Sequence, residues 1–334
     1  MTWRTFLSIT LTTLQLLIPA ISINSHTPHS LDHALTALRA QRNASFRFIQ
    51  IGAYIGATHK DPIFINALEQ QWSGVLVEPV PAVYEQLRNN YNAAEKQLQD
   101  LSTSTGSPRS DIESRLSFEN SAICDESKKT WLYYLSPSIV DEIINMLVPE
   151  GNDSTRSQMR DQLPNWSQQA SSLLHSQMVN VLTKYFQLNS DQAEIIADKS
   201  RIEIQCMTYE TLLNKHEQHL QQQMLINGTP EVQVDYVHID AEGYDWNVVL
   251  AIISVKKKYP LPYILCYESM HIGNIKFRKE KEVWLFTQHD YICEVVNNGE
   301  DTCCYQTSMI GTILPTFVSN LHTHAQHQEE KDEM

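Results

Sequence analysis

The strand-like segment FIQIGAYIGAT, residues 48–58, ends in two glycines whose spacing is suited to holding a ligand. In an open α/β sheet, ligands bind beyond the carboxyl ends of the strands, where small residues let a ligand approach the main chain. Gly52 permits a sharp exit from the strand, and Gly56 keeps Cβ atoms away from a ligand and from the following helix. The same G-x-x-x-G spacing also serves close packing, so the glycines alone indicate a cofactor loop only weakly.

A carboxylate at the end of the next predicted strand points to a nucleoside as the ligand. The segment GVLVEP places Glu78 directly after an apolar run, 26 residues beyond Gly52. A carboxylate at this position can accept hydrogen bonds from both hydroxyls of a ribose, and such charge-assisted bonds are directional. The alternative is a solvated Glu at a strand end. The glycines and the carboxylate together favour a nucleoside site.

Strands and helices alternate along most of the chain, which predicts an α/β fold with parallel pairing and right-handed crossovers. The polar segment 99–115 is predicted to be a loop, and 23–45 a lead-in with a helix at 31–40. The predicted strands are 46–51, 74–77, 116–123, 130–135, 201–207, 234–239 and 263–267, followed by a terminal hairpin of 291–296 and 302–306. The predicted helices between them are 62–71, 82–98, 245–253 and 276–287.

Between about 136 and 200 the strand pattern is replaced by a helical one. Apolar residues recur there at helical spacing, for example Leu174, Met178, Val181 and Tyr185. We therefore predict an inserted helical region, which either caps the sheet or forms a lid that selects a substrate.

Six segments of the chain, taken in order, resemble the FkbM-type S-adenosylmethionine-dependent methyltransferases. They are GAYIGAT, VEPVPAVYEQLRNNY, the turn Asn120-Ser-Ala-Ile, MTYETLL, DYVHIDAEGYDWNVVL and ILCYESMH. The resemblance covers roughly residues 46–306, interrupted by two insertions, and the predicted methyltransferase domain is 46–310. It implies a Rossmann-like class I methyltransferase fold with a mixed seven-stranded sheet, S-adenosyl-L-methionine as cofactor, and methyl transfer usually to a hydroxyl oxygen.

The resemblance also implies which residues contact the cofactor. Glu78 matches the ribose-binding acid, Ser121 and Ala122 match a turn near the adenine, and the signature D-x-E-G is Asp240 to Gly243. The cofactor-binding residues that it implies are Gln50, Gly52, Ala53, Tyr54, Gly56, Glu78, Ser121, Ala122 and Asp240.

Methyl transfer from a sulfonium requires donor and acceptor to be held in line and the acceptor's proton to be removed. We predict that Asp240 lies near the cofactor and that Glu242 or His271 accepts the proton. The alternative for Glu242 is a cap on the helix that begins near Asp245. His238, inside an apolar strand, is predicted to be a core residue rather than a base. No metal is required by this set of residues.

Three residues depart from the family pattern. Gln50 stands where the family has an Asp, and Tyr54 follows Ala53 where the family has an Asn. His238 replaces a usual Lys. These departures motivate a second hypothesis, a catalytically inactive protein that uses the methyltransferase fold for binding or trafficking in the secretory pathway. A nicotinamide oxidoreductase is disfavoured because no G-x-G-x-x-G occurs.

The composition of the 334-residue chain is that of a globular protein, with 42% hydrophobic residues. Its formal net charge of -14 repels a phosphate backbone, so nucleic acid is not expected as a partner. The expected substrate bears a hydroxyl and is a carbohydrate, a glycolipid or a small metabolite. The sequence does not indicate the oligomeric state.

The first 22 residues predict entry into the secretory pathway. Arg4 precedes an apolar stretch that ends in small residues, which is typical of a cleaved signal peptide; an uncleaved anchor is the alternative. After cleavage no membrane span is expected. Four glycosylation sequons follow, at Asn43, Asn152, Asn165 and Asn227. The polar tail 311–334 ends in KDEM, which either resembles an endoplasmic-reticulum retrieval signal or is simply acidic.

Six cysteines are too few for a disulfide-built scaffold of this length. Cys293 is predicted to bridge to Cys303 or Cys304 across the terminal strands, whereas three of the six lie in apolar runs and could be buried thiols.

Overall fold

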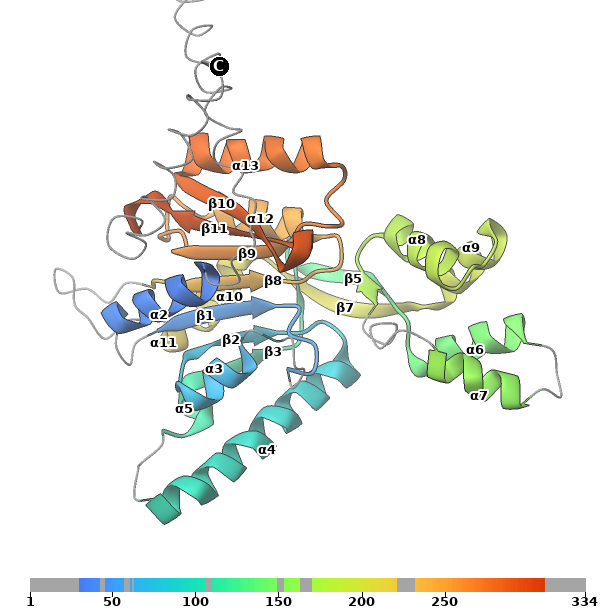
Figure 1. Ribbon diagram of the computed structural model, residues 1–334, viewed down its shortest axis with the longest axis horizontal. Helices are drawn as coiled ribbons and strands as arrows, with labels where there is room; N and C mark the ends of the chain where they lie inside the picture. Colours follow the sequence, from blue (N-terminus) through green and yellow to red (C-terminus); the bar gives the residue numbers. More distant parts are fainter. Residues whose placement is uncertain are drawn as a thin grey trace, which may run out of the picture. The chain divides into compact units, whose positions relative to one another are not determined.

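The computed structural model describes residues 30–42, 46–56, 61, 63–105, 110–148, 153–162, 170–220 and 232–309 (Figure 1). These residues fall into a terminal unit (Met1–Phe46 with Pro262–Met334) and a central unit (Arg47–Leu261). The predicted signal peptide, the C-terminal tail and the asparagines of all four sequons lie outside the described residues. None of the helices in the described ranges is both long and apolar enough to cross a bilayer.

The central unit contains four parallel strands in the order β8-β1-β2-β3. They are β1 (Arg47–Ile51), β2 (Ser73–Val77), β3 (Leu116–Glu119) and β8 (Tyr236–Ile239). Every residue of β1 is buried, as its unbroken apolar run predicts for a strand covered on both faces. The chain passes from β1 to β2 and β3 on one side and returns to β8 on the other. The switch point of this sheet therefore lies between β1 and β8.

Helices cover both faces of these strands. Phe118 and Glu119 are successive residues of β3 and so point to opposite faces. The Phe118 ring lies 5.7 Å from that of Tyr91 in α4, while Glu119 Oε2 lies 2.8 Å from Nε2 of His216. His216 caps the end of α10, so α4 and α10 lie on opposite faces. The helices concerned are α3 (Phe64–Glu69), α4 (Pro81–Thr105), α10 (Tyr209–Lys215), α11 (Glu217–Leu220) and α12 (Asp245–Ser254).

The prediction of a loop over 99–115 is wrong at both ends of that range. Helix α4 continues to Thr105, directly before Gly106, because the intervening residues include no glycine or proline to end it. A second short helix, α5 (Ile112–Arg115), begins after Asp111, whose carboxylate accepts a hydrogen bond from Glu113 N at 3.3 Å.

A second sheet, in the order β4-β7-β5-β6, takes up two strands that the sequence assigned to the main sheet. Its long strands β5 and β7 pair antiparallel. Exposed residues such as Trp131 and Glu203 alternate along them with buried ones such as Leu132 and Ile204. This alternation is typical of an antiparallel ladder with one solvated face rather than of a buried parallel strand. The strands are β4 (Ala122–Ile123), β5 (Lys128–Tyr134), β6 (Ser171–Ser172) and β7 (Arg201–Met207).

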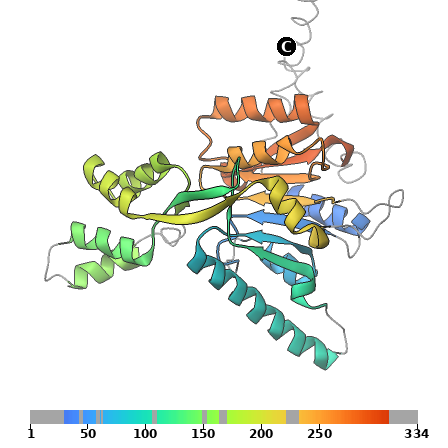
Figure 2. The same ribbon diagram turned by 180° about the vertical axis from the view of Figure 1, so that it is seen from behind.

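The predicted helical insertion is confirmed and lies at one end of the β5–β7 ladder (Figures 1 and 2). Its helices enclose a hydrophobic cluster of their own, built from residues between Leu135 and Ala197. Met178 and Val181 contribute to this cluster, whereas Leu174 and Tyr185 are 37% and 41% exposed despite their helical spacing. The helices are α6 (Pro137–Leu147), α7 (Asp153–Gln162), α8 (His175–Tyr185) and α9 (Ser190–Lys199).

The terminal unit holds three antiparallel strands in the order β10-β11-β9. The predicted hairpin is confirmed, with a 3-10 turn at Asn297–Gly299. The elements of this unit are α2 (Ser30–Arg42), β9 (Ile264–Glu268), α13 (Ile275–His289), β10 (Tyr291–Val296) and β11 (Asp301–Gln306). Apart from the second sheet, the central unit thus has four parallel strands and the terminal unit has three antiparallel strands. The fold is mixed α/β, as predicted.

All six cysteines form disulfides, which corrects the prediction that three are buried thiols. Cys293 pairs with Cys304, one of its two predicted partners, and Cys266 pairs with Cys303. Both bonds join residues that face each other directly in the strand register. The third, Cys124–Cys206, links β7 to the end of β4 in the central unit. The apolar runs around these cysteines did not reveal the pairs, because a disulfide-bonded cysteine is buried as readily as a free thiol.

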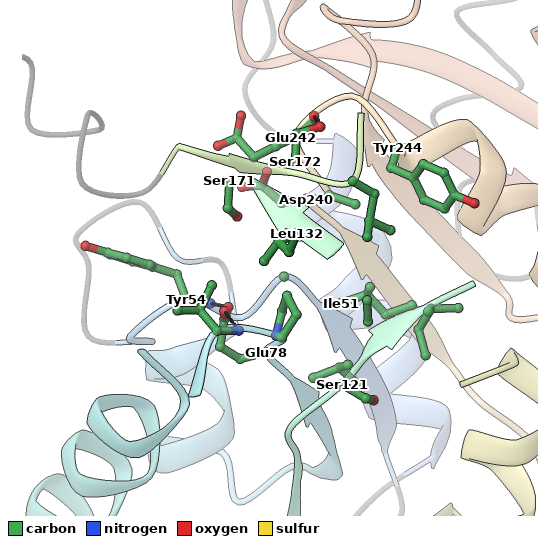
Figure 3. Close-up of a pocket in the computed structure, with 18 of the residues that line it drawn as sticks. Ile51, Tyr54, Glu78, Ser121, Leu132, Ser171, Ser172, Asp240, Glu242 and Tyr244 are labelled. Atoms are coloured by element: carbon green, nitrogen blue, oxygen red, sulfur yellow. Dashed lines mark hydrogen bonds between the residues drawn. The ribbon is translucent and has the colours of Figure 1, made fainter. Parts of the chain in front are cut away.

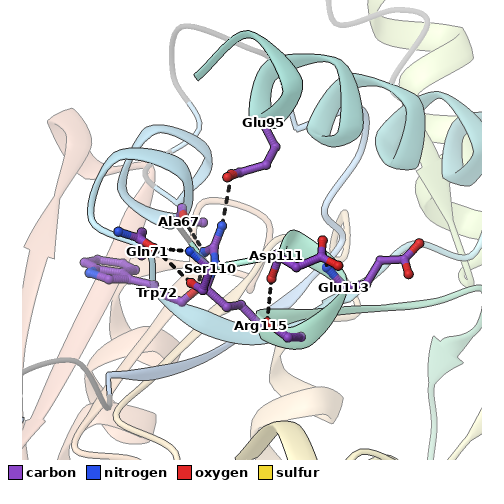
Figure 4. A network of polar contacts seen from close by, with 9 residues as sticks. Ala67, Gln71, Trp72, Glu95, Ser110, Asp111, Glu113 and Arg115 are labelled. Atoms are coloured by element: carbon purple, nitrogen blue, oxygen red, sulfur yellow. Dashed lines mark hydrogen bonds and ion pairs between the residues drawn. The ribbon is translucent and has the colours of Figure 1, made fainter. Parts of the chain in front are cut away.

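A buried ion pair ties α3, α4, α5 and the residue before β2 together (Figure 4). Arg115 Nη2 donates to Glu95 Oε2 at 3.0 Å, and Nη1 donates to the carbonyl oxygens of Ala67 at 2.8 Å and Trp72 at 3.0 Å. The two charged side chains are only 6% and 2% exposed. The guanidinium therefore neutralises a buried carboxylate and satisfies two main-chain acceptors at the edge of the sheet.

Candidate functional site

A cavity of about 70 Å³, partly open to solvent, lies at the carboxyl ends of β1, β2 and β8 (Figure 3). This is the switch point of the parallel strands, where open α/β sheets bind ligands. This volume lies below the range of about 300–1,000 Å³ that is usual for small-molecule sites. The segment after β3 and the strands β5 and β6 close its other sides.

The glycine loop is shaped by contacts within the protein. Gly52 has a φ of +80°, and a Cβ there would lie 1.8 Å from the carbonyl oxygen of Asp240. Gly56 has a φ of +71°, and a Cβ there would lie 2.6 Å from the Tyr91 ring. The first glycine thus lets the exit of β1 approach the end of β8, and the second makes room for α4. Gly52 and Tyr54 line the cavity, whereas Ala53 and Gly56 do not.

Glu78 points inward at the tip of β2 and is 5% exposed. Its Oε2 accepts a hydrogen bond from Tyr54 N at 3.0 Å, and its Oε1 accepts one from Val80 N at 2.9 Å. Burial, opposed by these two bonds and reinforced by the charge of Asp240, raises the pKa of Glu78 to about 7. A carboxylate offers roughly four lone-pair sites, so two remain for hydroxyl donors in the cavity.

The turn after β8 is held by a carboxylate that the sequence analysis did not single out. Asp245, fully buried, accepts hydrogen bonds from Ala241 N at 2.9 Å and Gly243 N at 3.0 Å. Glu242 therefore does not cap α12; the residue at the cap position is Tyr244. Asp245 could have been recognised from its place in the first turn of a helix, where a short acid often bonds to nearby N–H groups.

Glu242 lines the cavity in a left-handed conformation, with φ +49°. Burial, and then the charges of Asp240 and Asp245, hold the pKa of its carboxyl well above the ordinary value. Asp240 also lines the cavity, and its N–H donates to the carbonyl of Ile51 at 2.8 Å. The two acids of the D-x-E-G signature thus face the same space, which makes a proton acceptor available beside the end of β8.

The cavity is acidic. Glu78, Asp240 and Glu242 line it, and no lysine, arginine or histidine occurs among the described residues that do so. Such a surface favours a positively charged ligand and disfavours phosphate or carboxylate groups.

This acidity gives a pH-dependent stability that can be measured. Burial and Asp240 raise the pKa of Asp245 to about 7, as they do for Glu78. Both carboxyls hold protons more tightly in the folded than in the unfolded chain. Unfolding free energy should therefore fall as pH rises from about 4 through 7, by on the order of 3 kcal/mol for each group. Urea denaturation at pH 5 and pH 8 should show a smaller loss in Asp245→Asn than in wild type, while Asp141→Asn, which changes an exposed acid, should lose as much as wild type. An equal loss in all three proteins would contradict the assignment.

Two walls of the cavity come from β5, which precedes the insertion, and from β6, which lies within it between α7 and α8. Leu132 and Tyr134 of β5 and Ser171 and Ser172 of β6 face the cavity. No sequence signal marked these residues, because the second sheet was not predicted. Ser121 and Ala122, which were predicted, also line it; Ser121 is fully buried, and its Oγ has no hydrogen-bond partner among the described residues.

Three predicted residues have other surroundings. Gln50 is buried, and its Nε2 donates to Asp61 Oδ2 at 3.2 Å, so it does not line the cavity. His238 is the register partner of Gln50, and burial lowers its pKa to about 4, which keeps it neutral, as expected of a core residue. His271 belongs to the terminal unit, where its Nε2 lies 3.5 Å from Glu268 Oε1. Its part in catalysis stays a prediction.

Comparison with known proteins gives little support. No protein-family model and no curated protein sequence match the chain. Among solved structures, a match is the crystal structure of methyltransferase FkbM from Methylobacillus flagellatus KT, with 9% identity and a TM-score of 0.36. The match covers 78% of this chain and 44% of that one, so the chain spans less than half the length of that protein. A TM-score of this size does not establish a shared fold, and the function must be argued from the cavity.

Proposed function

We propose that the chain is an S-adenosylmethionine-dependent methyltransferase with a class I fold. The observation that carries the proposal is the inward-facing carboxylate of Glu78 at the tip of β2, beside a cavity at the switch point of the parallel strands. A carboxylate directed into a cavity at this place is suited to binding the hydroxyls of a ribose.

The residues present fit the cofactor. Glu78 retains lone pairs for ribose hydroxyls, and the unpaired hydroxyl of Ser121 can bond a polar edge of the base. Asp240 lies with Glu242 on the acidic side of the cavity, where a positive charge is stabilised. When bound, S-adenosylmethionine supplies a methyl group on a positively charged sulfur.

The acceptor is proposed to be a hydroxyl of a carbohydrate or small metabolite that carries no negative charge. The carboxylates and the lack of a cation among the described lining residues disfavour acidic acceptors. The raised pKa of the Glu242 carboxyl suits it to take up and hold the proton that the hydroxyl loses.

The compartment is proposed to be the secretory pathway, in the endoplasmic-reticulum lumen or outside the cell. The support is the three disulfides, since such bonds persist in oxidising compartments, together with the N-terminal signal-like segment.

Calorimetric titration with S-adenosylmethionine tests the proposal. Glu78→Gln should weaken binding by about 10- to 100-fold, because it removes charged hydrogen bonds of about 1.5–3 kcal/mol. Glu126→Gln, which changes an exposed acid of the same unit, should bind as wild type does. Absence of binding to the wild-type protein would instead favour the inactive, protein-binding alternative, with which the engagement of Gln50 by Asp61 is consistent.

A further inference from the structure

Strand β5, which precedes the insertion, and β6, which lies within it between α7 and α8, contribute one wall of the cavity. In Figure 3, Ser171 and Ser172 lie beside Glu242 and across the cavity from Glu78. Strand β6 is aligned by its pairing with β5, in which Ser172 faces Tyr133 and Ser171 faces Tyr134.

Ser172 makes a direct contact with the turn after β8, 70 residues away in sequence. Its side chain is 3% exposed, and its Oγ donates to the carbonyl oxygen of Glu242 at 3.0 Å. The Ser172 Oγ in turn accepts a hydrogen bond from Leu174 N at 3.1 Å. The hydroxyl therefore uses its donor and one acceptor site to join β6 to the turn.

This contact supports an unfavourable backbone conformation. A left-handed φ costs a residue with a side chain about 1–2 kcal/mol, so the turn at Glu242 needs outside contacts to persist. Asp245 bonds the N–H groups on both sides of Glu242, and Ser172 bonds its carbonyl. Together they fix the main chain from which the Glu242 carboxyl projects toward Asp240 and Asp245.

We propose that β5 and β6 form the acceptor side of the cavity and that Ser172 is a positioning residue that holds Glu242 for proton transfer. This rests on the proposed function. The wall joins apolar side chains, Leu132 and Leu173, to the aromatic Tyr134 and the hydroxyl of Ser171. It suits an uncharged acceptor that has both an apolar face and hydroxyls, as a sugar ring has.

Two adjacent serines provide a matched pair of variants. Ser172→Ala removes the bond to Glu242, whereas Ser171→Ala removes a lining hydroxyl that makes no such bond to any described residue. Ser172→Thr restores a hydroxyl. Loss of one hydrogen bond of about 1–1.5 kcal/mol predicts roughly 10-fold faster hydrogen exchange at the amides of Ala241 and Gly243 in Ser172→Ala alone.

The second readout is the pH dependence of S-adenosylmethionine affinity. Within the central unit, the acids whose charges raise the pKa of Glu242 are Asp240 and Asp245. The pKa of Glu78, which is raised to about 7, should be the same in every variant. Release of the turn lets the Glu242 carboxyl move away from its like-charged neighbours, so the pH at which affinity rises should fall by about one unit in Ser172→Ala. Ser172→Thr should restore the wild-type profile.

The outcomes separate the two proposals. Faster exchange and a shifted profile in Ser172→Ala, both absent from Ser171→Ala and reversed in Ser172→Thr, support Ser172 as a positioning residue. Identical exchange in the two alanine variants overturns it, whatever the cofactor affinity. If no variant and no wild-type protein binds S-adenosylmethionine, the proposed function fails, and the exchange comparison still decides whether Ser172 holds the turn.

Discussion

Gly52→Ala should destabilise the protein by more than about 3 kcal/mol, because two costs fall on one residue. At φ +80° any side chain strains the backbone, and the added Cβ would lie 1.8 Å from the carbonyl oxygen of Asp240. That neighbour is main chain and cannot rotate away. Since Gly52 joins β1 to the cavity, the variant should also lose cofactor binding. Urea denaturation and calorimetry measure the two effects.

Gly299→Ala is the control that separates the cost of backbone strain from the cost of a steric clash of the new Cβ. Gly299 has a φ of +97°, and no atom of the described residues lies within 4 Å of the place that a Cβ would occupy. Only the backbone cost of about 1–2 kcal/mol therefore applies. Similar losses in the two variants would show that β1 and β8 approach less closely than the structure has them.

Arg115→Met should cost about 3–5 kcal/mol, since it leaves the Glu95 carboxylate buried without its partner. Figure 4 shows the guanidinium between Glu95 of α4 and the main chain at Ala67 and Trp72. The free energy of unfolding, measured in urea, gives the loss. Arg160→Met, which breaks an exposed pair with Asp141, should change stability by less than about 1 kcal/mol.

The double variant Arg115→Met/Glu95→Met tests the cause. Removing both charges leaves no unpaired ion, so the double variant should be more stable than Arg115→Met alone. A double variant no more stable than Arg115→Met would mean that the bonds to Ala67 and Trp72, rather than the ion pair, dominate the contribution of Arg115.

The elements around the candidate site were the most predictable from sequence. Strands β1, β2 and β8 are short apolar runs followed by a glycine or an acid. They could be predicted because a buried parallel strand needs an apolar run. The same pattern placed Gly52, Glu78 and Asp240 at one edge of the sheet, where all three line the cavity.

The rest depends on contacts between distant segments. β5 and β7 read as members of the main sheet because apolar content alone does not say which sheet a strand joins. The bond between Ser172 and Glu242 spans 70 residues, and nothing in the local sequence of either residue requires it. Gln50 likewise could not be assigned its partner, Asp61, before the loop was folded.

The insertion has a hydrophobic centre of its own, whose buried residues all lie between Leu135 and Ala197 and against which Tyr133 of β5 packs. Its packing can be redesigned, by mutation or in evolution, without touching the residues that would grip the nucleoside. If the cavity has a cofactor side and an acceptor side as proposed, the residues that bind the methyl donor and those that select the acceptor can change independently in evolution. Relatives with a rebuilt insertion would then methylate different compounds while keeping one cofactor.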